Sequence, residues 1–238
     1  LRFQSSRSEG EGLVSLADYA GRMPEGQDKI YYINGPSREA LERGPYVEMF
    51  RKRNIEILYT LEPIDDFVLN HLGEFDGKKL VSADRADLEL PEAADKEDET
   101  AGQQGERLAE ADAESLCAWM KEVLGERIKE VALSRRLVDS PAMIVNADSY
   151  LTSSMERVLR ATAREDHLAM SGKKNMEINP ASPLIKKLAR LREADQDFAR
   201  DITEQIYDNA MIQAGLLVDS QQMVSRNYRI LERMAGRE

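Results

Sequence analysis

One acidic, polar segment divides this chain into two parts with different sequence patterns, and it constrains the fold more than any other feature. The segment covers residues 84–107 and includes "DKEDET" and "AGQQG". Such a composition buries too little apolar surface to offset the entropy that is lost on ordering. We therefore expect a mobile acidic linker between a first domain, residues 1–83, and a second domain, residues 108–238. A calcium site is disfavoured, because the spacing of a calcium-binding loop is absent.

The first domain has the pattern of a small α/β unit. "KIYYING" (Lys29–Gly35) and "IEILYT" (Ile55–Thr60) are short, apolar and rich in β-branched or aromatic residues, as buried strands are. A helical segment that is interrupted near Gly44 and Pro45 lies between them. This order predicts a parallel pair of strands with a right-handed crossover. "KLVS" (Lys79–Ser82) is a candidate third strand.

A second helix is expected after the strand that ends at Thr60. "PIDDFVLNHLGEF" starts with a proline and has apolar residues at helical spacing. These residues are Ile64, Phe67, Val68 and Leu72. The adjacent acids Asp65 and Asp66 suit the first turn of a helix, so they need no catalytic role. The chain contains no glycine motif of the dinucleotide, P-loop or hydrolase type, and nothing in it has the pattern of a catalytic site.

The second domain has a mixed pattern. A helix is expected from Leu108 to Leu124, with Gly125 as its stop. Apolar residues after it suggest a strand near residues 128–133, and "AMIVN" (Ala142–Asn146) is the expected return strand of a short antiparallel pair. The following stretch, "NADSYLTSSMERVLRAT", predicts a helix with one broad apolar side, which either packs into its own domain or stays open for a partner.

Two helices are expected at the end of the chain, with a break near Asp219. Their apolar residues recur at helical spacing, and a terminal helical hairpin has little of its own domain to cover it. Two copies would complete a four-helix bundle across a two-fold axis, whereas the alternative is a hairpin folded back on its own strands. The candidate dimerisation residues are Phe198, Ile202, Ile206, Met211, Val224, Tyr228 and Leu231.

Composition excludes several classes of function. A net charge of −11 and a pI near 4.9 argue against nucleic-acid binding, which needs a positive field. One cysteine, Cys117, and two histidines, His71 and His167, leave almost no ligands for a zinc site, so no metal is expected. No apolar run is long enough to span a membrane, and no signal peptide opens the sequence. We expect a cytoplasmic protein without membrane contact.

Several segments together resemble the heat-shock protein 90 chaperone family, in its bacterial branch. The resemblance rests on their order along nearly the whole chain, and "RRLVDSPA" with "EINP" is the most specific combination. The segments are "SLADYAGRMPEGQDKIYYING", "NIEILYT", "EFDGKKL", "LSRRLVDSPAMIV" and "MEINPASPLIKKL".

The resemblance implies a piece of a dimeric, ATP-driven chaperone: the end of its middle domain, a linker and its carboxy-terminal dimerisation domain. On this interpretation the nucleotide-binding domain lies upstream, so the chain is expected to be no enzyme and to hold no cofactor, with ATP and magnesium confined to the full-length parent. The implied partners are a second copy and unfolded or partly folded client proteins, with other chaperones as a further possibility.

The resemblance also implies a client-binding surface. In the family, an amphipathic helix and an aromatic residue from the end of the middle domain face the cleft between protomers. The matching positions here are Phe67, Leu151, Met155, Val158 and Leu159, with Met170 as a possible addition. The alternative is a purely structural dimerisation module, with all client contacts upstream.

Overall fold

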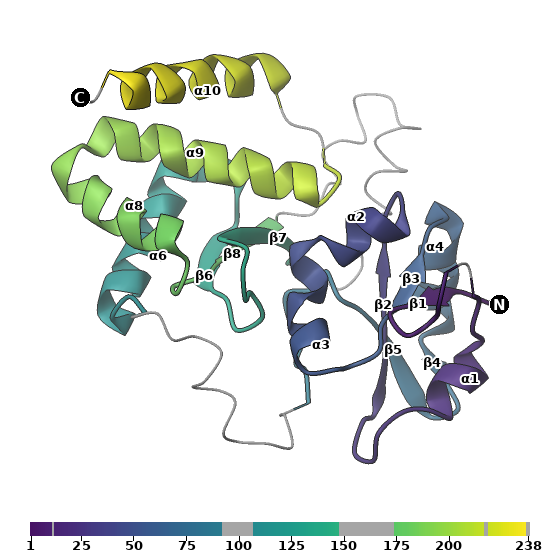
Figure 1. Cartoon of the computed structure of the whole chain (residues 1–238). Helices are drawn as coiled ribbons and strands as arrows, with labels where there is room; N and C mark the ends of the chain where they lie inside the picture. The colour runs from purple at the N-terminus through teal and green to yellow at the C-terminus, as the bar shows by residue number, and fades with distance from the viewer. Residues whose placement is uncertain (11, 92–106, 148–173, 217–218, 237–238) are drawn as a thin grey trace. The chain divides into compact units, whose positions relative to one another are not determined.

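The computed structural model describes residues 1–10, 12–91, 107–147, 174–216 and 219–236 (Figure 1). Its chain divides into two compact units, the first within Leu1–Asp98 and Asn146–Gly172, the second within Glu99–Val145 and Lys173–Glu238. Both units combine helices with a small sheet, so the mixed α and β character expected from the sequence is confirmed. The expected boundaries at residues 83 and 108 stay a prediction.

The first unit contains a sheet with short helices on both faces. Its sheet has the strand order β1-β3-β2-β5-β4. The elements are β1 (Gln4–Ser5), α1 (Leu16–Ala20), β2 (Lys29–Asn34), α2 (Arg38–Glu42), the 3₁₀ turn η1 (Pro45–Val47), α3 (Glu48–Lys52), β3 (Leu58–Thr60), α4 (Pro63–Leu72), β4 (Glu74–Phe75) and β5 (Lys78–Ser82).

Strand β2 is parallel to both β3 and β5, which confirms the predicted parallel pair and the third strand. Tyr32 lies opposite Leu58, and Ile30 lies opposite Leu80. The two edge strands, β1 and β4, pair antiparallel with their neighbours. The predicted interruption of the intervening helix also occurs, since α2 and α3 are separated by Gly44 and η1.

Apolar side chains from β2 fill both faces of this sheet. Tyr31 and Ile33 pack with Phe50 of α3 on one face, while Ile30 and Tyr32 pack with residues of α1 and α4 on the other. The four side chains of this apolar run, residues 30–33, are at most 3% exposed. Because successive residues of a strand point to opposite faces, a strand covered on both faces has a continuous apolar run, as "IYYI" does.

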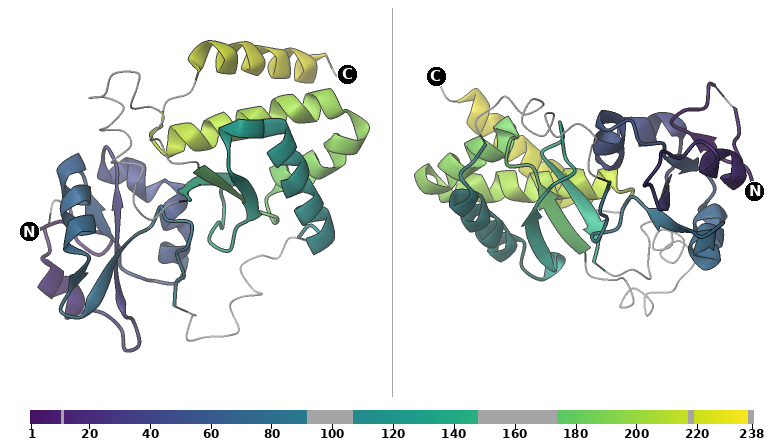
Figure 2. Two further views of the ribbon diagram at one scale, coloured as in Figure 1. Left: turned by 180° about the vertical axis from the view of Figure 1, so that it is seen from behind. Right: turned by 90° about the horizontal axis from the view of Figure 1, so that it is seen from below.

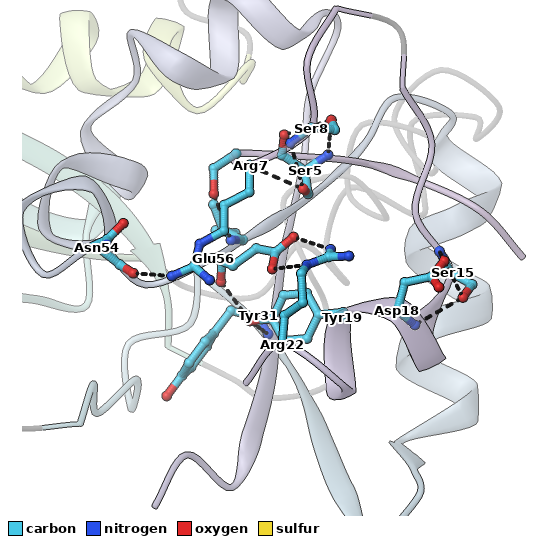
Figure 3. Close-up of polar contacts among 12 residues, drawn as sticks. Ser5, Arg7, Ser8, Ser15, Asp18, Tyr19, Arg22, Tyr31, Asn54 and Glu56 are labelled. Carbon is cyan, nitrogen blue, oxygen red and sulfur yellow. Dashed lines mark hydrogen bonds and ion pairs between the residues drawn. The ribbon is translucent and has the colours of Figure 1, made fainter. Parts of the chain in front are cut away.

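A buried tyrosine ties α1 to the sheet (Figure 3). The hydroxyl of Tyr19 donates to the main-chain oxygen of Glu56 at 2.6 Å, and it accepts from Gln27 and from the Tyr31 amide. The Glu56 side chain is paired in turn with Arg22 at 2.7 Å. Since Tyr19 is fully buried, these bonds satisfy a hydroxyl that would otherwise be costly to remove from water.

The residues just after β5 belong to the first unit. Asp84 accepts hydrogen bonds from Ser82 at 2.6 Å and, at 2.7 Å, from the side chain of Asn146, a residue that also belongs to the first unit. Leu88 is 9% exposed and packs in the core together with the half-buried Leu90. The beginning of the expected acidic linker is therefore ordered and packed.

The second unit contains a small sheet and a set of longer helices. Its elements are α6 (Glu110–Leu124), the 3₁₀ turn η2 (Gly125–Arg127), β6 (Glu130–Leu133), β7 (Ala142–Asn146), β8 (Lys174–Ile178), α8 (Pro183–Ala194), α9 (Gln196–Gln213) and α10 (Ser220–Ala235). The predicted helix near 108–124 and the break at Asp219 are both confirmed. Helix α8 was not predicted.

The expected antiparallel pair of β6 and β7 is wrong. Strand β8, which contains the "MEI" of "MEINP", lies between them in the order β6-β8-β7 and is parallel to β6. Residues 134–141 do not form a hairpin turn between β6 and β7. They are hydrogen-bonded to the residue that follows β8. The Asn179 side chain donates to the main-chain oxygens of Val138 and Ser140 at 3.1 and 3.2 Å.

A buried ion pair joins the same two segments. Arg136 and Glu177 lie 2.6 Å apart with side chains 8% and 12% exposed, and the Ser134 hydroxyl donates to Glu177 at 2.8 Å. The two most specific segments of the sequence, "RRLVDSPA" and "EINP", are thus in direct contact. Buried charges need such pairing, because an isolated one is costly.

Candidate interaction surfaces

Helices α9 and α10 lie side by side and run in opposite directions (Figures 1 and 2). The side of α10 that faces α9 is mainly charged rather than apolar. Its buried residues are Arg226, 3% exposed, and Ile230, 7% exposed. Helix α10 is therefore held to α9 largely by polar contacts.

Three arginines of α10 form these contacts, and we call them the arginine ladder: Arg226, Arg229 and Arg233. Arg226 pairs with Glu204 at 2.7 Å and also with Asp208. Each further arginine along α10 reaches a carboxylate nearer the start of α9, as antiparallel helices require. Arg229 pairs with Asp201 at 2.6 Å, and Arg233 pairs with Asp195 and covers the ring of Phe198.

Burial changes the proton affinity of one carboxylate in this interface. The pKa of Asp208 is raised above its ordinary value because burial disfavours the charged form, and the nearby Arg226 partly opposes that rise. A buried carboxylate of this kind needs its arginine partner to offset the free-energy cost of remaining charged. The ladder therefore stabilises charges that α9 would otherwise hold unpaired.

The opposite side of α10 is apolar and exposed. We call it the α10 apolar stripe: Val224, Tyr228, Leu231 and Met234, with exposures of 50%, 63%, 54% and 61%. The residues are three or four positions apart, so they lie along one side of the helix. On α9, Ile212 is also 48% exposed. Large apolar side chains gathered on one helix face mark an interaction surface more often than scattered ones do.

The predicted dimerisation residues fall into two groups. Val224, Tyr228 and Leu231 are the exposed ones, and they lie together in the α10 apolar stripe. Those on α9 are covered within the protomer: Phe198 and Ile206 are 4% exposed, Met211 is 7% exposed, and Ile202 is half-buried. The exposed Met234 and Ile212 were not predicted.

The arginine ladder was not predicted either, although the spacing of charged residues in the sequence indicates it. Arginines stand at positions i, i+3 and i+7 of α10, and acids stand at the same spacing on α9 in Asp201, Glu204 and Asp208. Matching stripes of opposite charge on consecutive helices predict an ionic contact between them.

Helix α4 carries the predicted aromatic residue of the client surface. Phe67 is half-buried, and two apolar neighbours on the same helix are strongly exposed, Ile64 at 64% and Leu72 at 43%. The buried side of the helix is instead formed by Asp66 and Leu69. We call the outward group, including the half-buried Val68, the α4 apolar face. The other predicted client residues, Leu151, Met155, Val158 and Leu159, and Met170 with them, lie outside the described residues.

None of the helices in the described residues is long and apolar enough to cross a membrane. Among the same residues, acids, histidines and cysteine form no group of three or more that could hold a metal ion.

Comparison with known proteins defines the class. The family model described as "Hsp90 protein" matches residues 1–238, so the chain belongs to the Hsp90 family of chaperones. Among curated relatives, it is 56% identical over 239 residues to the chaperone protein HtpG of Desulfotalea psychrophila, covering 100% of this chain and 38% of that protein. The family expected from the sequence segments is confirmed.

Two further relatives extend the comparison. The chain is 45% identical over 234 residues to the chaperone protein HtpG of Desulfitobacterium hafniense, covering 98% of this chain and 36% of the relative. It is 38% identical over 231 residues to the mitochondrial heat shock protein 75 kDa of Bos taurus, covering 97% of this chain and 33% of that protein. The chain thus spans between 33% and 38% of the length of these relatives.

These matches overturn two expectations. The chain was expected to be no enzyme and to hold no cofactor, with ATP and magnesium confined to residues outside it. The Hsp90 family model covers the chain from residue 1 to residue 238, so the exclusion of ATP hydrolysis and of nucleotide from this chain does not stand. The exclusion rested on placing the family's nucleotide-binding domain outside this chain, and a family match over the whole chain does not support that placement.

Proposed function

We propose that this chain works as a cytoplasmic molecular chaperone: two copies associate through their carboxy-terminal helices, and unfolded or partly folded proteins bind to apolar surfaces that include the α4 apolar face. The observation that carries the proposal is the α10 apolar stripe, whose four large side chains are each at least half exposed. Exposing such side chains to water is unfavourable unless a partner covers them. A second copy of α10 would bring the same stripe, as a two-fold axis requires.

The strength of this association can be bounded. Burying a large apolar side chain fully contributes about 1.5–3 kcal/mol, so four half-exposed ones on each of two copies contribute roughly 6–12 kcal/mol. Association itself costs about 4–15 kcal/mol. The stripe alone therefore supports a weak dimer, and a stable one needs further surface such as Ile212 and the half-buried Ile202 of α9.

Analytical ultracentrifugation over a range of concentrations tests the dimer. We expect wild-type protein at twice the chain mass of 26.9 kDa, and Leu231→Asp as a monomer. The matched control is Asn227→Asp, an exposed polar position on the same helix, which should leave the dimer intact. A wild-type monomer at every concentration, or a dimeric Leu231→Asp variant, would disprove association through the stripe.

Client binding needs a separate test, because a dimer can form without it. The probe is α-lactalbumin kept unfolded by reduction, whose aggregation is followed by light scattering. We expect the chain to suppress aggregation and the variants Ile64→Ser and Phe67→Ala to lose most of that effect. The control is His71→Ser, an exposed polar position on the same helix. If Ile64→Ser and Phe67→Ala suppress as well as wild type, α4 binds no client. If the wild-type chain itself suppresses no aggregation, the chain is only a dimerisation module.

A further inference from the structure

A cavity of about 250 Å³ lies in the first unit between the end of β1, the helices α2 and α3, and strand β3. It is built entirely from residues 6–59 and shares no residue with either apolar surface described above. Its floor is apolar: Val47, Phe50 and Ile57 are 3%, 1% and 1% exposed. A site of this size is smaller than the roughly 300 Å³ at which ordinary ligand pockets begin, so it suits a small molecule or one end of a larger one.

One wall of the cavity carries a polar group without a partner. Tyr59 is 3% exposed, and its hydroxyl has no hydrogen bond among the described residues. Burial raises the pKa of this phenol to about 12, so it is a hydrogen-bond donor at neutral pH. The hydroxyl oxygen is not among the fully buried unpaired atoms, so it is accessible at the cavity and can donate to a ligand there.

Two arginines at the cavity, Arg7 and Arg51, also have unused binding capacity. Arg7 donates to the main-chain oxygen of Asn54 at 2.8 Å, as Figure 3 shows, and Arg51 donates to that of Glu42 at 3.1 Å. Within the described part of the chain neither of them pairs with a carboxylate. Each planar guanidinium has five N–H donors, so most of them remain available.

The charge balance at the cavity favours an anion. Glu42 is the one acid among the described lining residues, and Arg38 already pairs with it at 2.7 Å while lying over the ring of Tyr59. Two positive charges are therefore left uncompensated here, although the chain as a whole has a net charge of −11. Arginine pairs of this kind favour carboxylates, which accept two parallel hydrogen bonds.

We propose that this cavity binds a small organic carboxylate, with its apolar body against Phe50 and Ile57 and its carboxylate at Arg7, Arg51 and the Tyr59 hydroxyl. Two sources share this chemistry. One is a free aromatic or branched-chain acid, and the other is the carboxyl end of a peptide whose last residue is apolar. The test below distinguishes them.

The probe is 3-phenylpropionate, followed by chemical shifts in the NMR spectrum of the chain. A ligand of about ten heavy atoms should bind with a dissociation constant on the order of 1 mM. The double variant Arg7→Gln with Arg51→Gln should bind at least about tenfold more weakly, since it loses charged hydrogen bonds. The neutral analogue 3-phenylpropionamide should be weakened similarly. Tyr59→Phe, which removes only the unpaired hydroxyl, should weaken binding several-fold.

The matched control is Arg43→Gln, an exposed arginine that follows α2 and pairs with Glu39. It should leave the affinity unchanged. N-acetyl-Gly-Gly-Phe with a free carboxyl group separates the two sources: tighter binding than 3-phenylpropionate indicates a peptide end, and weaker binding indicates a free acid. The proposal is overturned if no saturable shift occurs well above the expected constant, if the amide binds as well as the acid, or if the double variant binds like wild type.

Discussion

The guanidinium of Arg226 in α10 forms an ion pair with the carboxylate of Asp208 in α9, and the arginine is only 3% exposed. Its second nitrogen pairs with Glu204 at 2.7 Å. One buried cation thus holds two carboxylates of the neighbouring helix. Arg226 is therefore a central contact between α10 and α9.

Replacing Arg226 should therefore destabilise the fold strongly. Arg226→Met keeps much of the side-chain volume but leaves Asp208 and Glu204 without their cation. Removing one partner of a buried pair costs about 3–5 kcal/mol, and we expect about 3 kcal/mol because the Glu204 side chain is 30% exposed and partly hydrated. Urea unfolding followed by circular dichroism measures this. Arg43→Gln, which breaks an exposed pair, should change little, and equal stability of the two variants would contradict the prediction.

The buried hydroxyl of Tyr19 gives a smaller, local prediction. Tyr19→Phe removes the 2.6 Å hydrogen bond to the main-chain oxygen of Glu56 while keeping the ring in place. A net loss of about 1 kcal/mol is expected for one such bond. Differential scanning calorimetry should show a lower melting temperature for this variant. Ser225→Ala removes a hydroxyl from an exposed side chain outside the α10 apolar stripe, so it should melt like wild type.

The contact between the two family segments predicts a change in dynamics. Asn179→Ala removes the side chain that binds the main-chain oxygens of Val138 and Ser140. Amide hydrogen exchange in residues 134–141 should then be faster by about tenfold, because local opening loses hydrogen bonds worth roughly 1–2 kcal/mol. Asn209→Ala, at an exposed site on α9, should leave exchange in that loop unchanged. Unchanged exchange in Asn179→Ala would mean that the loop is held by Arg136 and Glu177 alone.

The single cysteine should be nearly inert in the folded chain. Burial raises the pKa of Cys117 from 9.0 to about 11, and the side chain is 6% exposed. At pH 8 the thiolate is then roughly a hundred-fold rarer than in the unfolded chain, so alkylation by iodoacetamide should be slower by at least that factor. A Ser225→Cys variant in a Cys117→Ala background places the thiol on an exposed surface and should react fast.

The same shift predicts how stability depends on pH. Because the folded pKa lies above the unfolded one, the folded state holds the thiol proton more tightly. The stabilisation is fully present below pH 9 and is lost as the pH rises from 9 towards about 11. Comparing wild type with Cys117→Ala by urea unfolding across this range isolates the effect, which must be absent from the variant.

Local patterns predicted the strands and most helices well, because each is determined by neighbouring residues. The run "IYYI" in β2 signalled burial on both faces, and Pro63 and Gly44 marked where α4 begins and where α2 gives way to η1. The order of strands in the second unit could not be predicted in this way. It depends on Asn179 and Glu177 holding a loop more than thirty residues earlier in the chain, and no local periodicity reports such a contact.

The interaction surfaces were predicted only in part for a related reason. Helical spacing reveals which side of a helix is apolar but not what covers that side. Phe198 and Val224 therefore have the same sequence pattern, although Phe198 is 4% and Val224 is 50% exposed. The difference arises because α10 turns its arginines, not its apolar residues, towards α9. Only the arrangement of the two helices in space separates a covered face from an open one.

The arginine ladder has a consequence for behaviour on heating. The hydration of ions becomes less favourable as temperature rises, so the penalty for bringing charges together out of water shrinks. An interface held by Arg226, Arg229 and Arg233 should therefore lose less of its strength on warming than one held by apolar contacts alone. The last helix of this chain should stay attached near the temperatures at which other proteins begin to unfold.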